Sequence, residues 1–526
     1  MKNVIDKISQ VGRNAAVIAA TSLVSRLLGI FRDRVLASEF GAGSVLDSYY
    51  AAFRIPDFVF NLIILGALSA ALIPIFSSLL FKNKEKAWQV VNNFASISFV
   101  FMAAVLLVLF FATPWLVKIM APGFEKEAFA MTVSMTRVML LSPIFFALSS
   151  IVGGVLNSFG RFFAYSIAPI IYNIGIICGA LYLVPTFGPA GLAWGVIAGA
   201  AGHLLIQLPT FFSSGFRFRP SFNLKDPYFK KILILMLPVT LGLALMQINL
   251  FVDSFFGSLL EEGSIAIINF STNIVSLPVG LVGISVAVSI FPLLAYAYTE
   301  KKEALFSFHF TGAFNLMVYL LIPAMVFTVL FRAYIVRLLL GAGLFDVSDT
   351  VWTSRALGYL SLSIVAQGMI PFLVRAFYAI GDTKTPVKIT FVAVFINILC
   401  SIIFTMIIPF RVVGLALAAS IAAFVNFFFL LLAIRKRFGH IDFVAILGPT
   451  GKYMLFSLAA GFVAYRTLYW VEPYIDTAMT LGLFLQTMIA GLAAVAIYII
   501  LSIIFKVPEA ERLVSGARRA LRVVRR

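Results

Sequence analysis

Residues 15–37 read AAVIAATSLVSRLLGIFRDRVLA, a stretch long and apolar enough to cross a lipid bilayer as one helix. The stretch nevertheless contains Arg26, Arg32, Asp33 and Arg34. A charged side chain at the centre of a bilayer costs about 3 kcal/mol or more, so such residues usually face a bundle interior or a water-filled cavity. The stretch therefore predicts an all-α membrane protein that holds positive charge inside the membrane, and it favours a transporter of anions.

The composition extends this prediction to the whole chain. Of its 526 residues, 62% are hydrophobic and only 12% are charged, which is more apolar than a soluble domain requires. Both cysteines, Cys178 and Cys400, lie in apolar stretches, and the three histidines are scattered. We therefore expect a polytopic membrane protein with no disulfide framework and no metal site built from cysteine or histidine.

About fourteen apolar segments of roughly 20 residues or more can be placed along the chain as membrane spans. Their approximate limits are 15–37, 47–80, 90–117, 130–157, 162–184, 189–212, 232–257, 264–297, 306–331, 355–380, 386–408, 412–434, 449–470 and 478–505. Lysine and arginine gather in every second loop, among them 82–86, 217–231, 301–302, 384–388 and 435–437. The positive-inside rule assigns these loops, and with them both termini, to the cytoplasm.

The chain also contains an internal repeat, in which matched residues are separated by a nearly constant distance along the sequence. The matched pairs are Pro74 and Pro292, Asp33 and Asp253, Cys178 and Cys400, and the tripeptides at 191–193 and 414–416. A six-span unit duplicated in this way keeps both copies parallel, and such repeats place the substrate between two lobes that alternate in access.

The predicted organisation has five parts, two of which are the copies of the repeat. They are an N-terminal six-helix lobe (1–213), a cytoplasmic linker (214–231), a C-terminal six-helix lobe (232–440), an extra two-helix unit (441–505) and a basic cytoplasmic tail (506–526). The tail carries six arginines after Pro508 and is predicted to form an amphipathic helix on an anionic leaflet, the alternative being a solvated basic tail.

The charged residues of the first span are the main candidates for substrate binding. On a straight helix Arg26 and Asp33 share a face while Arg32 points elsewhere. A bend at Gly29 would turn both arginines inward, where they could bind an anion. The alternative is that Arg32 and Arg34 reach the outer interface while Arg26 satisfies a neighbouring carbonyl.

The second span carries three further candidates. Arg54 and Asp57 flank Pro56, so they form either a local ion pair at a kink or a site in which Arg54 faces the cavity. Asp47 precedes Ser48 and is predicted to cap the helix that begins there, which is a structural role.

Asp253 lies deep in the seventh span, with Asn249 one helical turn earlier on the same face. Together with Asn397 in the repeat-related region, these oxygen atoms are candidates for coupling transport to Na⁺ or to protons. Hydrogen bonding between helices is the alternative for Asp253 and for Asn173, Asn397 and Asn426. Since the chain has no Walker-type motif and no phosphate-binding glycine loop, we expect no ATPase, no enzyme and no cofactor, and an ion gradient or the membrane potential would drive transport.

Several motifs resemble the MurJ (MviN) family over nearly the whole chain. They are SRLLG at 25–29 with Arg32 and Asp33, FGAG at 40–43 with Asp47, GALS at 66–69 before Pro74, Leu156-Asn157 before Arg161-Phe162, Ala168-Pro169 to Asn173, LAWG at 192–195 and DTKTP at 382–386. The resemblance implies a lipid II flippase of the multidrug/oligosaccharidyl-lipid/polysaccharide exporter superfamily. Such a protein moves an undecaprenyl-pyrophosphate-linked peptidoglycan precursor across the bacterial cytoplasmic membrane.

The resemblance also implies that residues 441–505 form an apolar groove for the lipid tail. The chain departs from the family at Phe60, Leu65 and Asn273, where family members carry charges in the cavity. The substrate site would then consist of Arg26, Arg32 and Asp33, with Arg54 of the second span as a compensating charge.

Two alternative functions remain open beside the flippase. They are export of another lipid-linked saccharide and a non-transporting role as a cell-wall scaffold. The expected partners are the lipid-linked substrate and membrane lipids, with no nucleic acid, and the expected state is a monomer.

Overall fold

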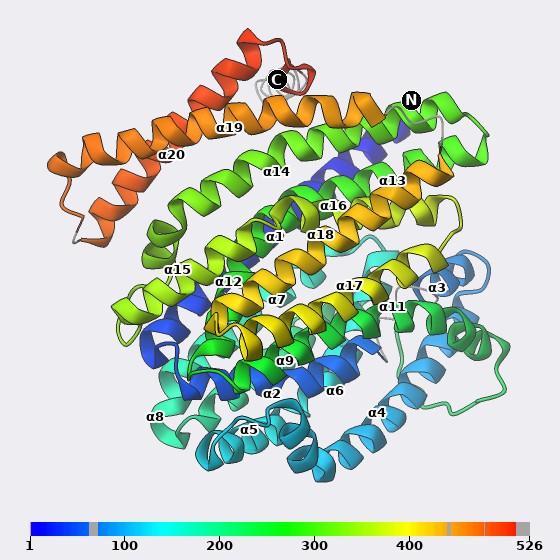
Figure 1. The fold of residues 1–526 in the computed structure, drawn as a ribbon. Helices are drawn as coiled ribbons and strands as arrows, with labels where there is room; N and C mark the ends of the chain where they lie inside the picture. The colour runs from blue at the N-terminus through cyan, green and yellow to red at the C-terminus, as the bar shows by residue number, and fades with distance from the viewer. Residues whose placement is uncertain (1, 63–71, 439–442, 478, 512–526) are drawn as a thin grey trace. The chain divides into compact units, whose positions relative to one another are not determined.

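The computed structural model is helical over the residues that it describes, 2–62, 72–438, 443–477 and 479–511 (Figure 1). Within these ranges ten helices are long and apolar enough to span a membrane, or eleven if one bent pair counts as a single span. The protein is therefore a multi-pass membrane protein, and the number of about fourteen spans stays a prediction. Leu65, the GALS motif, His440 and the arginines of the tail lie outside the described residues.

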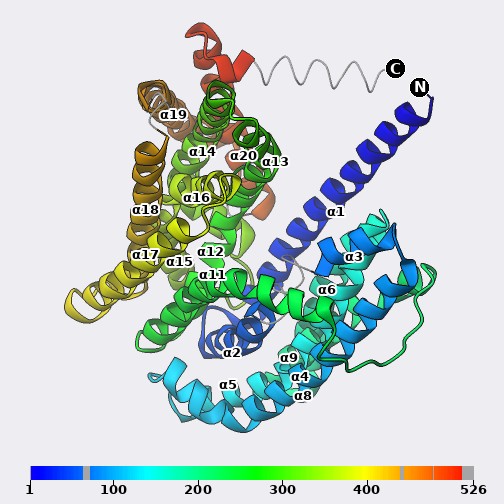
Figure 2. The same ribbon diagram turned by 90° about the vertical axis from the view of Figure 1, so that its right-hand side faces the viewer.

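The chain packs as two compact units, and unit 1 comprises Met1–Ala266 with Ala342–Asp346. Its helical elements are α1 (Lys2–Phe40), α2 (Ser44–Phe60), α3 (Ile73–Leu80), α4 (Lys84–Met120), α5 (Lys126–Met139), α6 (Ser142–Ser158), α7 (Phe162–Cys178), η3 (Gly179–Leu183), α8 (Val184–Phe187), α9 (Ala190–Leu205), α10 (Leu208–Phe212) and α11 (Pro227–Ser258). In this unit α4, α5, α6 and α9 pack against one another (Figure 2).

Unit 2 comprises Ile267–Gly341 and Val347–Arg526. It contains most of α12 (Ser264–Pro278), then η4 (Val279–Ile284), α13 (Ser285–Thr299), α14 (Glu303–Leu339), α15 (Val347–Ser361), α16 (Ile364–Ala379), α17 (Lys384–Ile402), η5 (Ile403–Ile407), α18 (Arg411–Arg437), α19 (Phe443–Val471), η6 (Glu472–Tyr474) and α20 (Thr480–Ile504). Because α11 packs with unit 1, the units do not coincide with the predicted lobes, and the five-part division stays a prediction.

The order of elements repeats along the chain, which supports the predicted duplication. Helices α4 and α14 both have 37 residues and begin at Lys84 and Glu303, a separation that matches the repeat. The π-helical turns η3 and η5 both have five residues, follow α7 and α17 respectively, and begin at Gly179 and Ile403, again at the spacing of the repeat. Since π-helical turns are rare, a matched pair of them is a specific sign of common origin.

Glycines bring the backbones of α7 and α9 together. A Cβ atom on Gly195 would lie 2.6 Å from Cα of Gly179, and one on Gly199 would lie 2.6 Å from the carbonyl oxygen of Tyr172. Glycines four positions apart recur at 175 and 179 and at 191, 195 and 199. This spacing lets two membrane helices approach closely without side chains between them.

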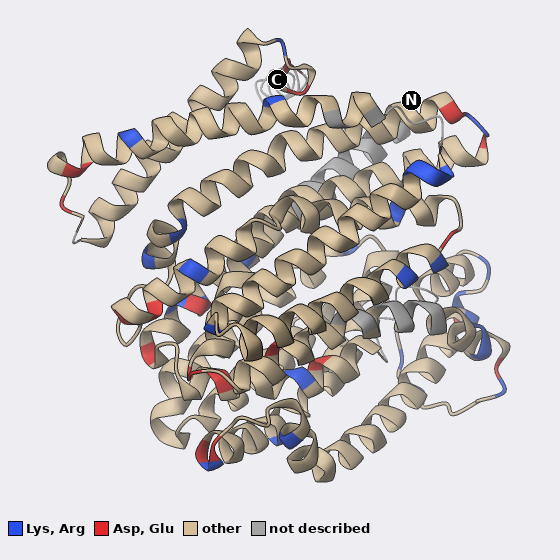
Figure 3. Ribbon diagram, in the orientation of Figure 1, with Lys and Arg blue, Asp and Glu red and all other residues tan. Residues whose placement is uncertain are grey.

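Charged side chains lie mainly in loops and at helix ends (Figure 3). At the start of α17, the carboxylate of Asp382 accepts hydrogen bonds from the backbone N–H groups of Lys384 and Thr385, at 3.1 and 3.0 Å, and from the hydroxyl of Thr385 at 2.7 Å. The DTKTP motif is therefore a helix cap, which satisfies N–H groups that have no partner within the helix.

Helices α19 and α20 pack against each other and against α14 (Figure 1). Their shared core contains Phe331, Ala464, Leu468, Ala490 and Ala494. Hydroxyl groups fix the other end, where Tyr319 donates to Ser502 at 3.1 Å and Tyr498 donates to the backbone oxygen of Tyr319 at 2.8 Å. The extra helix pair is thus an integral part of unit 2.

Candidate functional site

An arginine and an aspartate of the first span form an ion pair inside unit 1. Nη2 and Nε of Arg32 donate to Oδ1 of Asp33, at 2.7 and 3.1 Å, and Nη1 donates to Oδ1 of Asn173 at 3.1 Å. Asp33 is buried, and the side chain of Arg32 is 22% exposed. A guanidinium group has five N–H donors, so two remain available to a ligand after these three bonds.

Asn173 links this ion pair to α7. Its Nδ2 donates to the carbonyl oxygen of Pro169 at 2.9 Å, which leaves Oδ1 oriented toward Arg32. A Cβ atom at Gly29 would lie 3.9 Å from the same Oδ1, an ordinary contact distance. Helix α1 runs as one helix from Lys2 to Phe40. The helix is therefore not broken at Gly29, where the sequence allowed a bend, and Arg32 still contacts Asp33 and Asn173.

Arg26 differs from Arg32 in its surroundings. It is half-buried and makes no hydrogen bond or ion pair with any residue in the described ranges. Arg26 and Arg32 are six positions apart on α1, so they present two levels of positive charge along one helix.

Arg54 belongs to a separate charged cluster between α2 and α11. It is buried at 7% exposure, and its Nε donates to Oγ of Ser254 at 2.9 Å. The negative charges of Asp253 and Asp57 both act on Arg54. The bond to Ser254 gives Arg54 a partner outside α2, and the two interpretations of Arg54, a local pair with Asp57 and a site that faces the cavity, both stay predictions.

The three residues predicted to couple ions are not in one unit. Asp253 and Asn249 lie on α11 of unit 1, where the buried Oδ1 of Asn249 has no hydrogen-bond partner among the described residues. Asn397 lies on α17 of unit 2 and accepts a hydrogen bond from Ser401 at 3.1 Å. Within the described part of the chain, no group of three or more His, Cys, Asp or Glu side chains could hold a metal ion.

The prediction that Asp47 caps its own helix is wrong. Asp47 lies inside the first turn of α2 and does not cap that helix; its carboxylate accepts hydrogen bonds from the N–H groups of Gly263 and Ala266, at 2.7 and 2.8 Å. It therefore caps α12, a helix far along the chain. Gly263 has a φ of 85°, and a Cβ atom there would collide with the carbonyl group of Ala42, so only glycine lets the two loops meet.

The hydrogen bonding between helices predicted for Asn173 is found, because its Oδ1 accepts from Arg32 of α1. Sequence reasoning did not identify Arg32 as that partner, and it missed Ser254 as the partner of Arg54. Ser254, next to Asp253, carries no signal of this contact, because a serine in an apolar helix usually bonds to its own backbone, as Ser254 also does with Leu250.

Two of the three positions that lack a family charge lie in the described ranges. The ring of Phe60 packs against Phe146 at a centroid distance of 5.6 Å, so this position contributes apolar surface. Asn273 lies on α12 in unit 2. The substrate-binding arginines predicted in unit 1 are Arg26 and Arg32 of α1 and the buried Arg54 of α2.

Known proteins with similar sequences are described as lipid II flippases. The chain is 29% identical over 484 residues to a probable lipid II flippase MurJ of Vibrio cholerae, covering 90% of this chain and 91% of that one. It is 29% identical to the lipid II flippase MurJ of Burkholderia cenocepacia over 81% of this chain and 84% of the relative.

Solved structures agree with these relatives. A lipid II flippase MurJ in an inward closed conformation matches with a TM-score of 0.78 and 26% identity, over 93% of this chain and 98% of that one. An inward-facing multidrug transporter of the MATE family and MOP superfamily matches with a TM-score of 0.67 at 16% identity, over 81% of this chain and 98% of that one, which shows a shared fold.

The family model for the lipid II flippase MurJ matches residues 36–504, which include all the helices from α2 to α20. This match spans both units, the cap made by Asp47 and the extra helix pair. The chain therefore belongs to the lipid II flippase MurJ family, whose members are transporters and not enzymes.

Proposed function

We propose that this protein is a flippase that moves lipid II across the bacterial cytoplasmic membrane by alternating access. The observation that carries the proposal is Arg32, a guanidinium in an apolar helix that is held by Asp33 and Asn173 and retains two N–H donors. Lipid II carries a pyrophosphate, and arginine binds phosphate groups through paired N–H donors. The family membership supplies the class of substrate.

Within this proposal the site residues have separate roles. Arg26 and Arg32 bind the pyrophosphate, while Asp33 and Asn173 hold Arg32 in position until the substrate arrives. Arg54 adds positive charge from α2. Its burial near two carboxylates suits a residue that changes partners during the cycle, because a buried charge needs a counter-charge in every state.

The remaining parts of the proposal concern energy, orientation and the lipid tail. Asp253 and Asn249 couple transport to Na⁺ or protons, supported by the buried Oδ1 of Asn249. Both termini lie in the cytoplasm, supported by the basic loops. The α19–α20 pair holds the polyprenyl tail, supported by its broad exposed apolar surface, which includes Leu455, Phe462 and Leu492.

Complementation of a bacterium depleted of its own lipid II flippase tests the proposed function. Cells that express this protein should survive depletion, and labelled lipid II should reach the outer face of their membranes. Arg32→Gln, expressed at the same level, should fail in both assays. Arg337→Gln is the control and should succeed, because Arg337 belongs to unit 2 and donates a hydrogen bond to the backbone oxygen of Thr477. Survival without appearance of lipid II outside would contradict the proposal and favour a scaffold.

A further inference from the structure

Two arginines flank one indole ring in unit 2, and a third arginine lines the same cavity. Arg332 comes from α14, Arg355 from α15, and Arg411 is the first residue of α18. The guanidinium carbons of Arg355 and Arg411 lie 5.1 and 5.0 Å from the centroid of the Trp352 ring. Cation–π contact of this kind fixes the plane of a guanidinium while leaving its edge for hydrogen bonding.

The three arginines line a single cavity with a volume of about 640 Å³. None of the described residues that line it is acidic. Its other walls include Tyr359, Leu362 and Phe410, each of which is more than one third exposed. The cavity therefore combines concentrated positive charge with exposed apolar surface.

The local backbone is arranged to form this cluster. A Cβ atom at position 358 would lie 2.8 Å from Cδ of Arg332, so Gly358 provides the space in which the Arg332 side chain lies across α15. Nη1 of Arg332 donates to the backbone oxygen of Val329 at 2.8 Å. Arg411 has a φ of 53°, a conformation that non-glycine residues rarely adopt.

The position of the cluster within unit 2 is also unusual. It lies toward the end of α14 and the start of α18, whereas the basic loops of this unit, at 301–302, 384–388 and 435–437, lie at the other ends of these helices or at the start of α17. The positive-inside rule disfavours arginines at this end. Arg332 is seven positions before the end of α14, a depth of about 10 Å along the helix axis.

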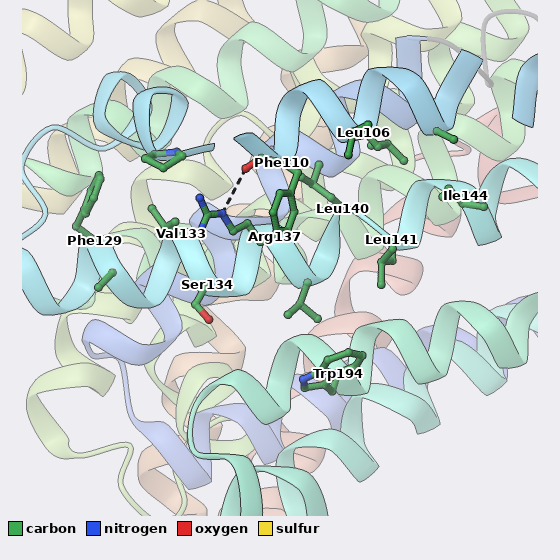
Figure 4. Close-up of a pocket in the computed structure, with 15 residues that line it drawn as sticks. Leu106, Phe110, Phe129, Val133, Ser134, Arg137, Leu140, Leu141, Ile144 and Trp194 are labelled. Atoms are coloured by element: carbon green, nitrogen blue, oxygen red, sulfur yellow. Dashed lines mark hydrogen bonds between the residues drawn. The ribbon is translucent and has the colours of Figure 1, made fainter. Parts of the chain in front are cut away.

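The repeat offers an internal comparison in unit 1 (Figure 4). Arg137 occupies the position that matches Arg355 and lines a cavity of about 800 Å³ whose other walls are mainly apolar. Its Nε donates to the carbonyl oxygen of Phe110 at 3.3 Å. Pro114, four positions after Phe110, has no N–H to offer that carbonyl, so Arg137 replaces a missing helix hydrogen bond. The cavity of unit 1 thus has one arginine with a structural role where that of unit 2 has three.

We propose that Arg332, Arg355 and Arg411 around Trp352 form a binding site for the phosphate-bearing headgroup of a membrane lipid. The guanidinium groups of Arg332 and Arg355 bind the phosphate oxygens, Arg411 adds positive charge, and Tyr359, Leu362 and Phe410 contact the lipid chains. Two lipids offer this chemistry at this depth: an anionic phospholipid and a polyprenyl pyrophosphate. Binding at this site does not require that the protein transport either lipid.

Equilibrium binding to the purified full-length protein in neutral detergent tests the site. The probes are phosphatidylglycerol, undecaprenyl pyrophosphate and inorganic pyrophosphate, each titrated against wild type and the double variant Arg332→Gln/Arg355→Gln. All titrations are repeated after Arg26→Gln/Arg32→Gln is added to wild type and to the double variant. This removes binding at the proposed transport site, so the remaining difference between the two proteins reports on the unit 2 cavity. Arg337→Gln, on the same end of α14 but outside the cavity, is the matched control, and Arg332→Lys/Arg355→Lys tests whether charge alone suffices.

We expect the double glutamine variant to bind at least one of the two lipids about tenfold or more weakly, the loss of hydrogen bonds to a charged group. The same loss should appear in the background that lacks the α1 arginines, and Arg337→Gln should bind like wild type. Loss with undecaprenyl pyrophosphate alone identifies the polyprenyl lipid, and loss with phosphatidylglycerol identifies the phospholipid. Unchanged binding of both lipids, or equally tight binding of inorganic pyrophosphate, would overturn the proposal; failure of transport complementation would not.

Discussion

At the scale of single residues, Arg32 shows how a charged side chain can be held among packed helices. Three of its five N–H groups are satisfied by Asp33 and Asn173, and one of those partners neutralises its charge. A pair of this kind lowers the cost of burial, since an isolated charge would lack both counter-charge and hydrogen bonds. The same pair leaves two N–H donors of Arg32 for the proposed pyrophosphate ligand.

The contributions of Arg32 and Asn173 to transport should differ in size. Arg32→Gln removes the charge and three hydrogen bonds and should lower the rate of lipid II translocation about a hundredfold or more, whereas Asn173→Ala removes one hydrogen bond to a charged group, worth about 1.5 kcal/mol, and should lower it about tenfold. Translocation of labelled lipid II in membrane vesicles measures both. Equal losses would show that Asn173 contacts the substrate directly.

Substitution of Asp253 should abolish the proposed coupling of transport to an ion. Asp253→Asn preserves shape but removes the charge that would bind Na⁺ or a proton, so transport should lose its dependence on that ion. Transport rates measured in vesicles over a range of Na⁺ concentrations and external pH values provide the test. Asp57→Asn removes the other carboxylate near Arg54 and should keep the ion dependence; an unaltered dependence in Asp253→Asn would rule out the coupling role.

At the scale of helices, α12 depends on a cap from a distant part of unit 1. Asp47→Ala leaves the N–H groups of Gly263 and Ala266 without their buried acceptor, and should lower the free energy of unfolding by about 2 kcal/mol or more. Thermal unfolding in detergent measures this effect. Asp47→Asn keeps one acceptor oxygen and should lose less, and a wild-type unfolding temperature for Asp47→Ala would refute the capping role.

The contact between α7 and α9 should be intolerant of added side chains. A methyl group at Gly195 would collide with the backbone at Gly179, so Gly195→Ala should cost about 1–3 kcal/mol of stability through overpacking. Gly491→Ala in α20 is the matched control, because a Cβ atom there meets nothing within 4 Å. The unfolding temperature should fall for Gly195→Ala and not for Gly491→Ala. Equal unfolding temperatures for the two variants would contradict the close backbone contact at Gly195.

At the scale of the whole molecule, the repeat and the basic loops predict a single orientation. In a background of Cys178→Ala and Cys400→Ala, a cysteine introduced at Tyr474 should react with a membrane-impermeant maleimide in intact spheroplasts. A cysteine introduced at Lys82 should react only after the membrane is opened. Both positions are exposed, so the comparison reports sidedness and not burial. Labelling of Lys82→Cys in intact spheroplasts would show that the predicted orientation is wrong.

The membrane class and the charged first helix could be predicted from the sequence because each depends on local pattern. The duplication stays a prediction based on fixed spacing, and the matched 37-residue helices α4 and α14 support it. The partners of polar side chains could not be predicted in this way. Asp47 caps a helix 216 residues away, and Arg54 bonds to Ser254, because such partners depend on how the helices pack and not on neighbouring sequence.

The bond between Asp47 and α12 also bears on how the chain is made. A ribosome adds about 5–20 residues each second, so the acceptor exists for roughly 10–40 s before Ala266 emerges. During that interval the carboxylate of Asp47 on α2 exists without the N–H groups that it accepts from in the folded protein. A nascent chain that is halted before residue 266 therefore lacks this hydrogen bond. Quality-control proteases should degrade it faster than a chain that is halted shortly after residue 266.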